Sequence, residues 1–508
     1  MNSVEVDQKI AEATYVEDLD YTTGSDGQVY SSPEQKAIVE SYDAKRVAKL
    51  RWKIDWHLIP ACGFLYLLCF LDRGNIGNAK IAGMNTDLGL SSHQYSVILT
   101  VFFATYCTVE APCNIILKIL SAKIFLPMIA VLWGICVLGM GFAKSYHHLI
   151  VLRILLGLFE AGLMPGCAYY LSNWYRPTEV SYRIALYFSA ATIAGAFSGI
   201  LAWAIMKMDG IGGMAGWSWI FIIEGILTIV VGCLCYFFIY NSPKTCGFLT
   251  DEEITYWEWH LKQDVGKSNE ELDNEPLQWK HIKQGAFHWR VWYMVILSLG
   301  CTVPIYSFSY FLPTIINTLG WTASTAQLMS APPYIWACLC TIVVSYYSDK
   351  FKNRVYFIVG PMLFCGIVGF AMALGQDKTG VTYAGVFLAC AGQYAPWPSI
   401  VSWNANNYPN SHTRGIAMGI QIGFASAGGV VASFIYRSED APRFTLGHSV
   451  VLGATVIGMV LTIILAFYLR WVNAKKENYC KEHPEVYNED PHELAKLDEA
   501  NPLFRYIY

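Results

Sequence analysis

The stretch IFLPMIAVLWGICVLGMGFA, residues 124–143, contains no charged side chain. An α-helix rises about 1.5 Å per residue, so roughly 20 residues cross the ~30 Å hydrocarbon layer of a bilayer. The whole chain shares this bias, because 54% of its 508 residues are hydrophobic and only 15% are charged. An average soluble protein has roughly 25% charged residues. The chain is therefore a membrane protein rather than a set of soluble domains.

Twelve apolar runs follow one another along the chain, and the largest polar insertion, residues 241–289, separates the sixth from the seventh. The runs lie at about 54–72, 93–117, 124–143, 149–174, 183–206, 217–240, 290–316, 326–347, 355–375, 381–404, 414–436 and 448–470. We therefore predict an all-α membrane protein with twelve transmembrane helices in two six-helix bundles. The predicted segments are a disordered cytosolic tail (1–50), a first bundle (51–240), a cytosolic loop (241–289), a second bundle (290–471) and a cytosolic tail (472–508).

Lysine and arginine residues indicate how the chain is oriented. They concentrate at 45–53, before the first run, and in alternate loops such as 118–123, 176–183, 350–354 and 470–476. Cytoplasmic loops hold the excess of positive charge in membrane proteins. Both termini and the central loop are therefore expected in the cytosol.

Small residues recur at every fourth position in the fifth and eleventh runs, which occupy corresponding places in the two halves. Such stripes let helix backbones approach closely in lipid. Their matched positions favour a repeated architecture. The residues are Ala191, Gly195 and Gly199 in the fifth run, and Gly415, Gly419, Gly423 and Ala427 in the eleventh.

Six charged side chains lie within or at the ends of the apolar runs, and a charge at mid-membrane costs at least ~2.5–3.5 kcal/mol and so needs a reason. For Asp72 and Arg73 the alternative is an interfacial pair that marks the end of a helix, and for Arg153 the alternative is a place near an interface. Arg153 and Glu160 lie seven residues apart. Seven helical steps return to within about 20° of the same face, so we expect both side chains in one cavity. The six residues are Asp72, Arg73, Glu110, Arg153, Glu160 and Glu224.

These residue types suit the binding of an anion together with a proton. A carboxylate in a desolvated cavity can exchange a proton as its neighbours change. Arginine binds both oxygens of a carboxylate and keeps its charge. Histidines occur only at the ends of runs or in loops. Proton coupling therefore falls to Asp72, Glu110 or Glu160.

Other function classes lack support. The sequence contains no nucleophile elbow, zinc-protease helix or phosphate-binding loop, so it is predicted not to be an enzyme or an ATP-driven pump. Its fifteen cysteines include many within apolar runs and are expected to be free thiols without a metal. A net charge of −4 gives no sign of nucleic-acid binding. No cofactor is expected.

Several stretches together resemble the anion:cation symporter family of the major facilitator superfamily, and in particular its fungal allantoate, vitamin and nicotinate permease branch. The similarity covers about residues 50–475. The stretches are FLDRGNIGNAKIAGMNTDLGLS (70–91), EAPCN (110–114), RILLGLFEAGLMPG (153–166), NWY (173–175), GWSWIFIIEG (216–225), FSYFLPTII (308–316) and SWNANNYPNSHTRGIAMG (402–419).

The resemblance implies a two-bundle fold with alternating access and symport of small organic anions with protons. It implies proton-coupling roles for Asp72 and Glu160, and substrate binding or acid pairing for Arg73 and Arg153. It also implies that Tyr106 lines the same pocket.

One departure concerns the cytoplasmic gate. The loop between the second and third runs, NIILKILSAKIF, lacks the acidic residue of the superfamily's gate signature. The equivalent second-half loop keeps Asp349, Lys350 and Arg354. We therefore expect stronger gating contacts in the second half; an ordinary basic inner loop is the alternative.

Aromatic and amide residues in the second half are further candidates for the substrate site. Tyr306, Tyr310 and Phe311 lie in the seventh run, and Trp397, Trp403 and Asn404 lie in the tenth. These runs face the cavity in the fold that the resemblance implies. A ring-bearing carboxylate such as nicotinate could stack there while its carboxylate meets an arginine.

The sequence thus predicts a monomeric, proton-coupled importer of a small organic anion in the lipid bilayer of the plasma membrane, with an endomembrane as the alternative. Nicotinate is the first candidate substrate. Pantothenate, biotin, allantoate and dipeptides are alternatives, and a nutrient sensor that does not transport is the alternative from another class.

Overall fold

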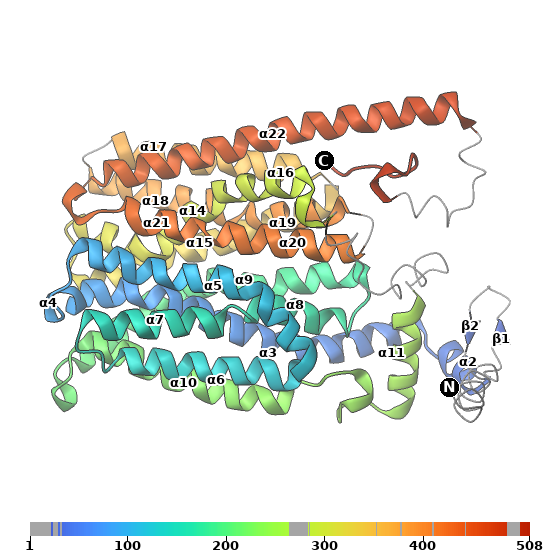
Figure 1. Ribbon diagram of the computed structural model, residues 1–508, viewed down its shortest axis with the longest axis horizontal. Helices are drawn as coiled ribbons and strands as arrows, with labels where there is room; N and C mark the ends of the chain where they lie inside the picture. Colours follow the sequence, from blue (N-terminus) through green and yellow to red (C-terminus); the bar gives the residue numbers. More distant parts are fainter. Residues whose placement is uncertain are drawn as a thin grey trace, which may run out of the picture.

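The described residues of the computed structural model are almost entirely helical, and the two halves lie side by side (Figure 1). The start of α3 (Ala44–Ala79) and the end of α22 (Thr445–Glu482) lie at the same end. We refer to that end as cytoplasmic, following the distribution of basic residues, and to the opposite end as outer. The structure describes residues 22–23, 29–30, 33–263, 283, 285–351, 353–375, 378–408, 411–441, 443–484 and 498–508.

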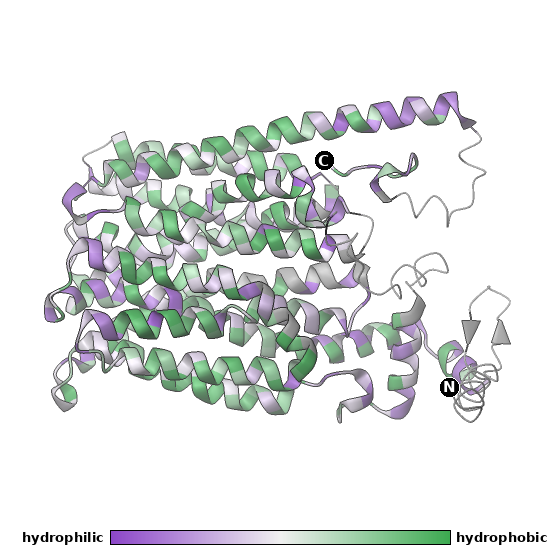
Figure 2. Ribbon diagram, viewed as in Figure 1, coloured by the Kyte–Doolittle hydropathy of each residue, from purple (hydrophilic) through white to green (hydrophobic). Residues whose placement is uncertain are grey.

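The N-terminal bundle is built from six helical spans, of which the fourth is broken at residues 161–162. Hydrophobic residues cover the middle of the spans and hydrophilic residues gather toward the two ends (Figure 2). The spans are α3 (Ala44–Ala79), α5 (Ser92–Leu120), α6 (Ala122–Met140), α7 with α8 (Tyr146–Glu160 and Leu163–Ser172), α9 (Pro177–Ile205) and α10 (Gly216–Phe238).

The C-terminal bundle repeats this pattern with three interrupted spans. The fourth of its spans is broken at Ala395 and Pro396. The spans are α14 (Trp289–Thr318), α15 (Ala323–Phe351), α16 with η5 and α17 (Arg354–Pro361, Met362–Ile367 and Val368–Gly375), α18 with α19 (Thr379–Tyr394 and Trp397–Asn406), α20 with α21 (Ser411–Ser426 and Gly428–Ile435) and α22 (Thr445–Glu482).

These spans coincide with the twelve apolar runs of the sequence. Within the described residues, nine helical segments are long and apolar enough to cross a membrane by length and composition. The other three predicted runs are helical as well, and they form α5, α9 and the broken pair α18–α19. The prediction of an all-α fold with two six-helix bundles is confirmed.

The predicted boundaries need correction at both ends. The first span begins at Ala44 rather than at residue 51, and α2 (Pro33–Glu40) precedes it, so part of the predicted disordered tail is helical. A two-residue pairing of β1 (Thr22–Thr23) with β2 (Val29–Tyr30) also lies there. At the other end α22 continues to Glu482, well past residue 471.

A further helix, α11 (Asp251–Gln263), lies in the central loop, packs on α2 and contacts the N-terminal bundle through side chains. Lys53 Nζ pairs with Glu253 at 2.7 Å, and Arg46 pairs with Glu252 at 3.0 Å. Trp257 Nε1 donates to the carbonyl of Trp174 at 2.9 Å. The described first part of the loop, residues 241–263, is therefore part of the cytoplasmic surface of the first half.

The two bundles meet through α9 and α15, through α3 and α14, and through α5 with α20 and α21. The stripe on α9 allows the first contact, because Gly195 lies under the ring of Tyr334 and Gly199 lies against the carbonyl of Gln327. In the eleventh span, by contrast, a Cβ at Gly415 or Gly419 would meet no described atom within 4 Å. The predicted close packing at those two positions is therefore wrong.

Candidate functional site

A cavity of about 760 Å³ lies between the two bundles and extends toward the cytoplasmic end. Arg73 and Tyr306 line its inner part, and the exposed Tyr346 and Lys350 on α15 line its mouth. Other lining residues include Tyr66, Cys69, Phe70, Tyr106, Leu186, Thr302, Tyr394, Trp397, Pro398, Ile422 and Ser426.

The bundles are closed against each other on the outer side of this cavity. Gln327 Nε2 donates to the carbonyl oxygen of Asn78 at 3.4 Å, which links α15 to α3. A Cβ placed on Gly77 would lie 2.5 Å from the carbonyl oxygen of Tyr310, so α3 and α14 touch through their backbones. The protein is therefore in an inward-open conformation.

Gly77→Ala is expected to disfavour this conformation, because the added methyl forces α3 and α14 apart at the outer closure. Spin labels at Leu186 on α9 and Tyr346 on α15, both exposed and lining the cavity, would report the opening. The distance between them should shift toward shorter values. Gly63→Ala on the same helix is the matched control, because nothing lies within 4 Å of a Cβ there. An unchanged distance in the Gly77 variant would contradict the assigned closure.

Arg73 is the central side chain of the site. Its guanidinium forms a buried ion pair with Glu160, and Cys69 Sγ donates to the same carboxylate oxygen at 2.7 Å. The other side of Arg73 reaches the second bundle, where NH1 donates to the Tyr306 hydroxyl at 3.3 Å. The guanidinium also lies 4.7 Å from the centre of the Tyr106 ring. Arg73 therefore connects the buried acid to the cavity.

Glu160 and Arg153 are fully buried, and neither lines the cavity. The prediction that both side chains look into one cavity is therefore wrong, because Arg73 and Cys69 lie between Glu160 and the open space. Within the described residues, Arg153 forms no hydrogen bond through its three guanidinium nitrogens. Its charge still interacts electrostatically with Glu160 and Asp72.

The side chain of Asp72 points to a different face of α3 from that of its neighbour Arg73, because successive side chains of a helix are about 100° apart. Its Oδ2 accepts from Trp133 Nε1 at 3.0 Å and from Thr228 Oγ1 at 3.3 Å. One turn further along α3, Asn75 donates to Glu224. Asp72 and Glu224 therefore form a second acidic group inside the N-terminal bundle, away from the cavity.

Glu110 occupies a third position, at the contact between the bundles. A Cβ on Gly423 of α20 would lie 2.8 Å from Glu110 Oε2, and that oxygen has no hydrogen-bond partner in the described structure. Nearby, Cys107 Sγ donates to the carbonyl of Gly423 at 3.4 Å. This acid therefore lies at the contact between the two bundles.

The second-half candidates divide into two groups. Tyr306 lines the cavity, whereas Tyr310 lies at the outer closure and stacks on Tyr306 with ring centres 6.4 Å apart. Trp403 donates instead to the carbonyl of Ile507 at 2.8 Å. Asn404 donates to Gln421 at 2.7 Å inside the bundle. The structure does not bring Trp403 or Asn404 to the cavity.

Several lining residues, Tyr394 and Pro398 among them, were not among the candidates chosen from the sequence, whereas Trp397 was. Tyr394, Trp397 and Pro398 flank the break between α18 and α19 and line the cavity together. The Pro396 break itself was the available signal, because irregular backbone in a membrane span is tolerated where it borders protein or a water-filled cavity.

One of the predicted gate residues lies at the mouth of the cavity. Lys350 lines it, and Arg354 NH1 donates to Ser348 Oγ at 3.1 Å. The side chain of Asp349 lies outside the described residues. Stronger gating contacts in the second half stay a prediction.

The first half has its own ion pairs at the cytoplasmic end, although the loop between its second and third spans lacks the acidic residue of the gate signature. Arg183 binds both carboxylate oxygens of Asp55, at 2.9 and 3.1 Å, and so joins α9 to α3. Arg51 pairs with Glu179 at 2.7 Å. These acids lie on the first and fifth spans, where a search of the loop alone could not find them.

Comparisons with known proteins agree with this architecture. The family model of the Major Facilitator Superfamily matches residues 62–433. The chain is 36% identical to the MFS-type transporter cnsO of Penicillium expansum, over 96% of this chain and 96% of that protein. It is 32% identical to the high-affinity nicotinic acid transporter of Saccharomyces cerevisiae, over 99% of this chain and 90% of that protein.

Solved structures share the fold at low sequence identity. A bacterial homolog to the human lysosomal transporter Spinster, in an inward-facing and unoccupied conformation, matches with a TM-score of 0.61 and 15% identity, over 81% of this chain and 95% of that chain. The nucleoside transporter NupG matches with a TM-score of 0.55 and 13% identity, over 80% and 99% of the respective chains. With its two helical bundles and the cavity between them, the chain belongs to the major facilitator superfamily of membrane transporters.

Proposed function

We propose that this transporter imports a small organic monocarboxylate together with protons across the plasma membrane, with nicotinate as the first candidate. The observation that carries the proposal is the buried ion pair between Arg73 and Glu160 at the inner end of an aromatic cavity. The 32% identity to a nicotinic acid transporter of yeast supports the choice of substrate.

Arg73 is the group that suits a substrate carboxylate. Its side chain lines the cavity, and its planar guanidinium can bind both oxygens of a carboxylate. Tyr106 and Tyr306 line the cavity beside it and offer ring faces to a planar substrate. An anion with a flat ring therefore matches both the charge and the surface of this part of the cavity.

Coupling to protons follows from charge balance. In the absence of substrate, Glu160 neutralises Arg73. A substrate anion that binds Arg73 would leave Glu160 without its counter-charge in a buried site, which is unfavourable. Protonation of Glu160 removes that excess charge and frees Arg73 for the anion. One proton would then accompany each monocarboxylate through this pair.

The remaining buried charges can take part in the same balance. Among the residues that the structure describes, four carboxylic acids are buried at membrane depth, against two arginines. Because unpaired buried charge is costly, some of these acids must carry protons at rest. Arg153, whose guanidinium lacks a hydrogen bond in the described structure, is a further counter-charge close to Glu160 and Asp72. The residues are Asp72, Glu110, Glu160 and Glu224, with Arg73 and Arg153.

A ligand panel tests the proposal most directly. Nicotinate is expected to raise the melting temperature of the purified transporter, because a ligand that binds only the folded state stabilises it. Nicotinamide is the matched control, since it keeps the ring but lacks the charge. Pantothenate, biotin, allantoate and a dipeptide complete the panel.

Uptake of labelled ligand into cells without their own permeases then separates transport from sensing. Accumulation of the stabilising anion should increase as the external pH falls. If the anion binds but is never taken up, the protein is a sensor rather than an importer. If no carboxylate in the panel binds, the proposed substrate class is wrong.

A further inference from the structure

The last eleven residues, 498–508, lie against the cytoplasmic end of the C-terminal bundle. This segment begins with the short helix η8 (Asp498–Ala500) and continues without regular secondary structure to Tyr508. It contacts residues of α14, α16, α19 and α22, so four spans meet on one short piece of chain.

Two asparagine side chains each bind both the N–H and the carbonyl group of one residue of this segment. Asn407, just after α19, accepts from Ile507 N at 2.9 Å and donates to Ile507 O at 3.1 Å. Asn473 on α22 does the same with Tyr506, at 2.9 and 2.8 Å. A side-chain amide used in this way replaces a neighbouring β-strand. Trp403 adds a third bond to the Ile507 carbonyl, at 2.8 Å.

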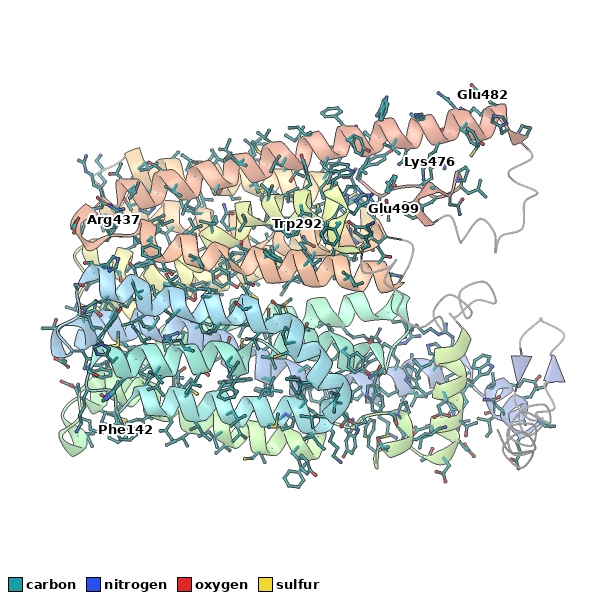
Figure 3. All side chains as sticks on the ribbon, in the orientation of Figure 1. Phe142, Trp292, Arg437, Lys476, Glu482 and Glu499 are labelled. Atoms are coloured by element: carbon teal, nitrogen blue, oxygen red, sulfur yellow. The ribbon has the colours of Figure 1, made fainter. Side chains whose placement is uncertain are left out.

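Charged groups hold the other end of the segment. Lys476 on α22 donates to the carbonyls of Glu499 and Asn501 at 2.7 and 3.0 Å. Arg290 on α14 forms an ion pair with Glu499 and lies 4.7 Å from the ring centre of Tyr506. Figure 3 shows Lys476 and Glu499 close together at the cytoplasmic end, far from Arg437 at the outer end. The segment is therefore bound along most of its length.

The segment also contacts a helix that borders the transport cavity. Trp397 and Pro398 at the start of α19 line the cavity, and Trp403 near its end contacts the segment. The span is broken at Ala395 and Pro396, just before α19. Proline breaks of this kind are the places where helices bend. The bound segment connects the C-terminal end of α19 to α22.

We propose that the cytoplasmic end of the C-terminal bundle is a peptide-binding surface for the chain's own residues 498–508, and that the bound segment is a strap that keeps α19 away from the N-terminal bundle. The strap thereby holds the cytoplasmic entrance open. Closing the entrance requires α19 to move, so release of the strap favours the closed entrance. This regulation goes beyond the proposed substrate and does not depend on it.

Cys480 on α22 reports whether the strap is bound. Its side chain is buried, its residue being only 2% exposed, and its Sγ lies 3.4 Å from the carbonyl oxygen of Pro502. The full chain would be treated with a membrane-impermeant maleimide at its cytoplasmic face, and labelled Cys480 would be identified by mass spectrometry. Labelling is expected to be slow in the unaltered chain.

The double variant Asn407→Ala with Asn473→Ala removes the backbone pairing and should increase labelling of Cys480 about tenfold, because several hydrogen bonds are lost together. A chain truncated after residue 497 should be labelled at least as fast. Adding the free peptide DEANPLFRYIY to the truncated chain should restore protection, whereas a scrambled peptide should not. Asn406→Ala, which removes an amide beside Asn407, is the matched control.

Spin labels at Leu186 on α9 and Val401 on α19 test the effect on the entrance. Carried on unnatural amino acids, they leave the native cysteines in place. The distance between them should shorten when the strap is removed and lengthen again when the peptide is added. Unchanged labelling of Cys480 in the double variant would overturn the binding surface. Faster labelling with an unchanged distance would overturn the role of the strap in holding the entrance open.

Discussion

Glu160→Gln is expected to abolish accumulation of the substrate against its gradient while preserving exchange of substrate for substrate. Glutamine resembles a permanently protonated glutamate, so Arg73 stays free to bind the anion but no proton can be released. The residue is fully buried and paired with Arg73, so its charge state directly sets that of the site. Coupling should be lost even though binding remains.

Two assays in reconstituted vesicles separate accumulation from exchange. Uptake driven by a pH gradient measures accumulation, and counterflow without a gradient measures exchange. Loss of the ion pair leaves the positive charge of Arg73 buried without a partner, which can lower the stability of the folded protein by about 3–5 kcal/mol. The elution profile and the melting temperature of the variant must therefore be checked first. Glu252→Gln on α11 serves as the control, because that acid pairs only at the cytoplasmic surface with Arg46. Normal pH-driven accumulation in the Glu160 variant would exclude it as the coupling residue.

The same assay on Glu110→Gln tests the alternative proton carrier. This acid lies against Gly423 at the contact of the bundles rather than beside the substrate arginine. If Glu110→Gln removes pH-driven accumulation and Glu160→Gln does not, coupling belongs to the contact between the bundles.

Arg73→Lys is expected to weaken substrate binding by about 100-fold although the positive charge is kept, because an ammonium cannot form the paired hydrogen bonds of a guanidinium. In the structure Arg73 reaches Glu160 on one side and Tyr306, at 3.3 Å, on the other. A lysine has a single nitrogen and cannot serve both. The loss should therefore appear as a raised dissociation constant and a lower rate of exchange.

Calorimetric titration of the purified variant with the anion identified by the ligand panel measures this effect. Arg153→Lys is the informative comparison, because that residue is equally buried but does not line the cavity. A much smaller loss of affinity is expected there. Equal losses at both positions would mean that Arg153 also contacts the anion, in a conformation other than the inward-open one.

Local chemistry explains why the sequence predicted the spans and the buried charges so well. A bilayer demands about 20 apolar residues per helix, and this requirement is visible residue by residue. It also makes every charge within a span conspicuous. The prediction of one shared cavity for Arg153 and Glu160 was wrong because helical phase gives the face of a helix but not which neighbour covers it. The helix face that carries Arg73 borders the cavity, whereas the helix face that carries Arg153 is covered by neighbouring side chains.

Trp403 and Asn404 illustrate a second limit. Their position in the tenth span resembled that of cavity residues, yet Trp403 binds Ile507, 104 positions later in the chain. Its partner lies in a predicted tail whose composition gave no sign of a binding role. Hydropathy cannot detect such a contact, because an extended segment bound through its backbone has no characteristic side-chain pattern.

The sequence by itself determined the helical class, the division into two halves and the set of charged residues that the membrane must accommodate, because these depend on the cost of placing each residue in lipid. Only the tertiary structure decided that Glu160 pairs with Arg73, 87 positions away, and that Arg73 reaches Tyr306, 233 positions away. It also decided that Arg153 stands apart from the cavity. Partners of this kind depend on how two bundles pack in space, and packing is a property of pairs of residues that no single stretch of sequence contains.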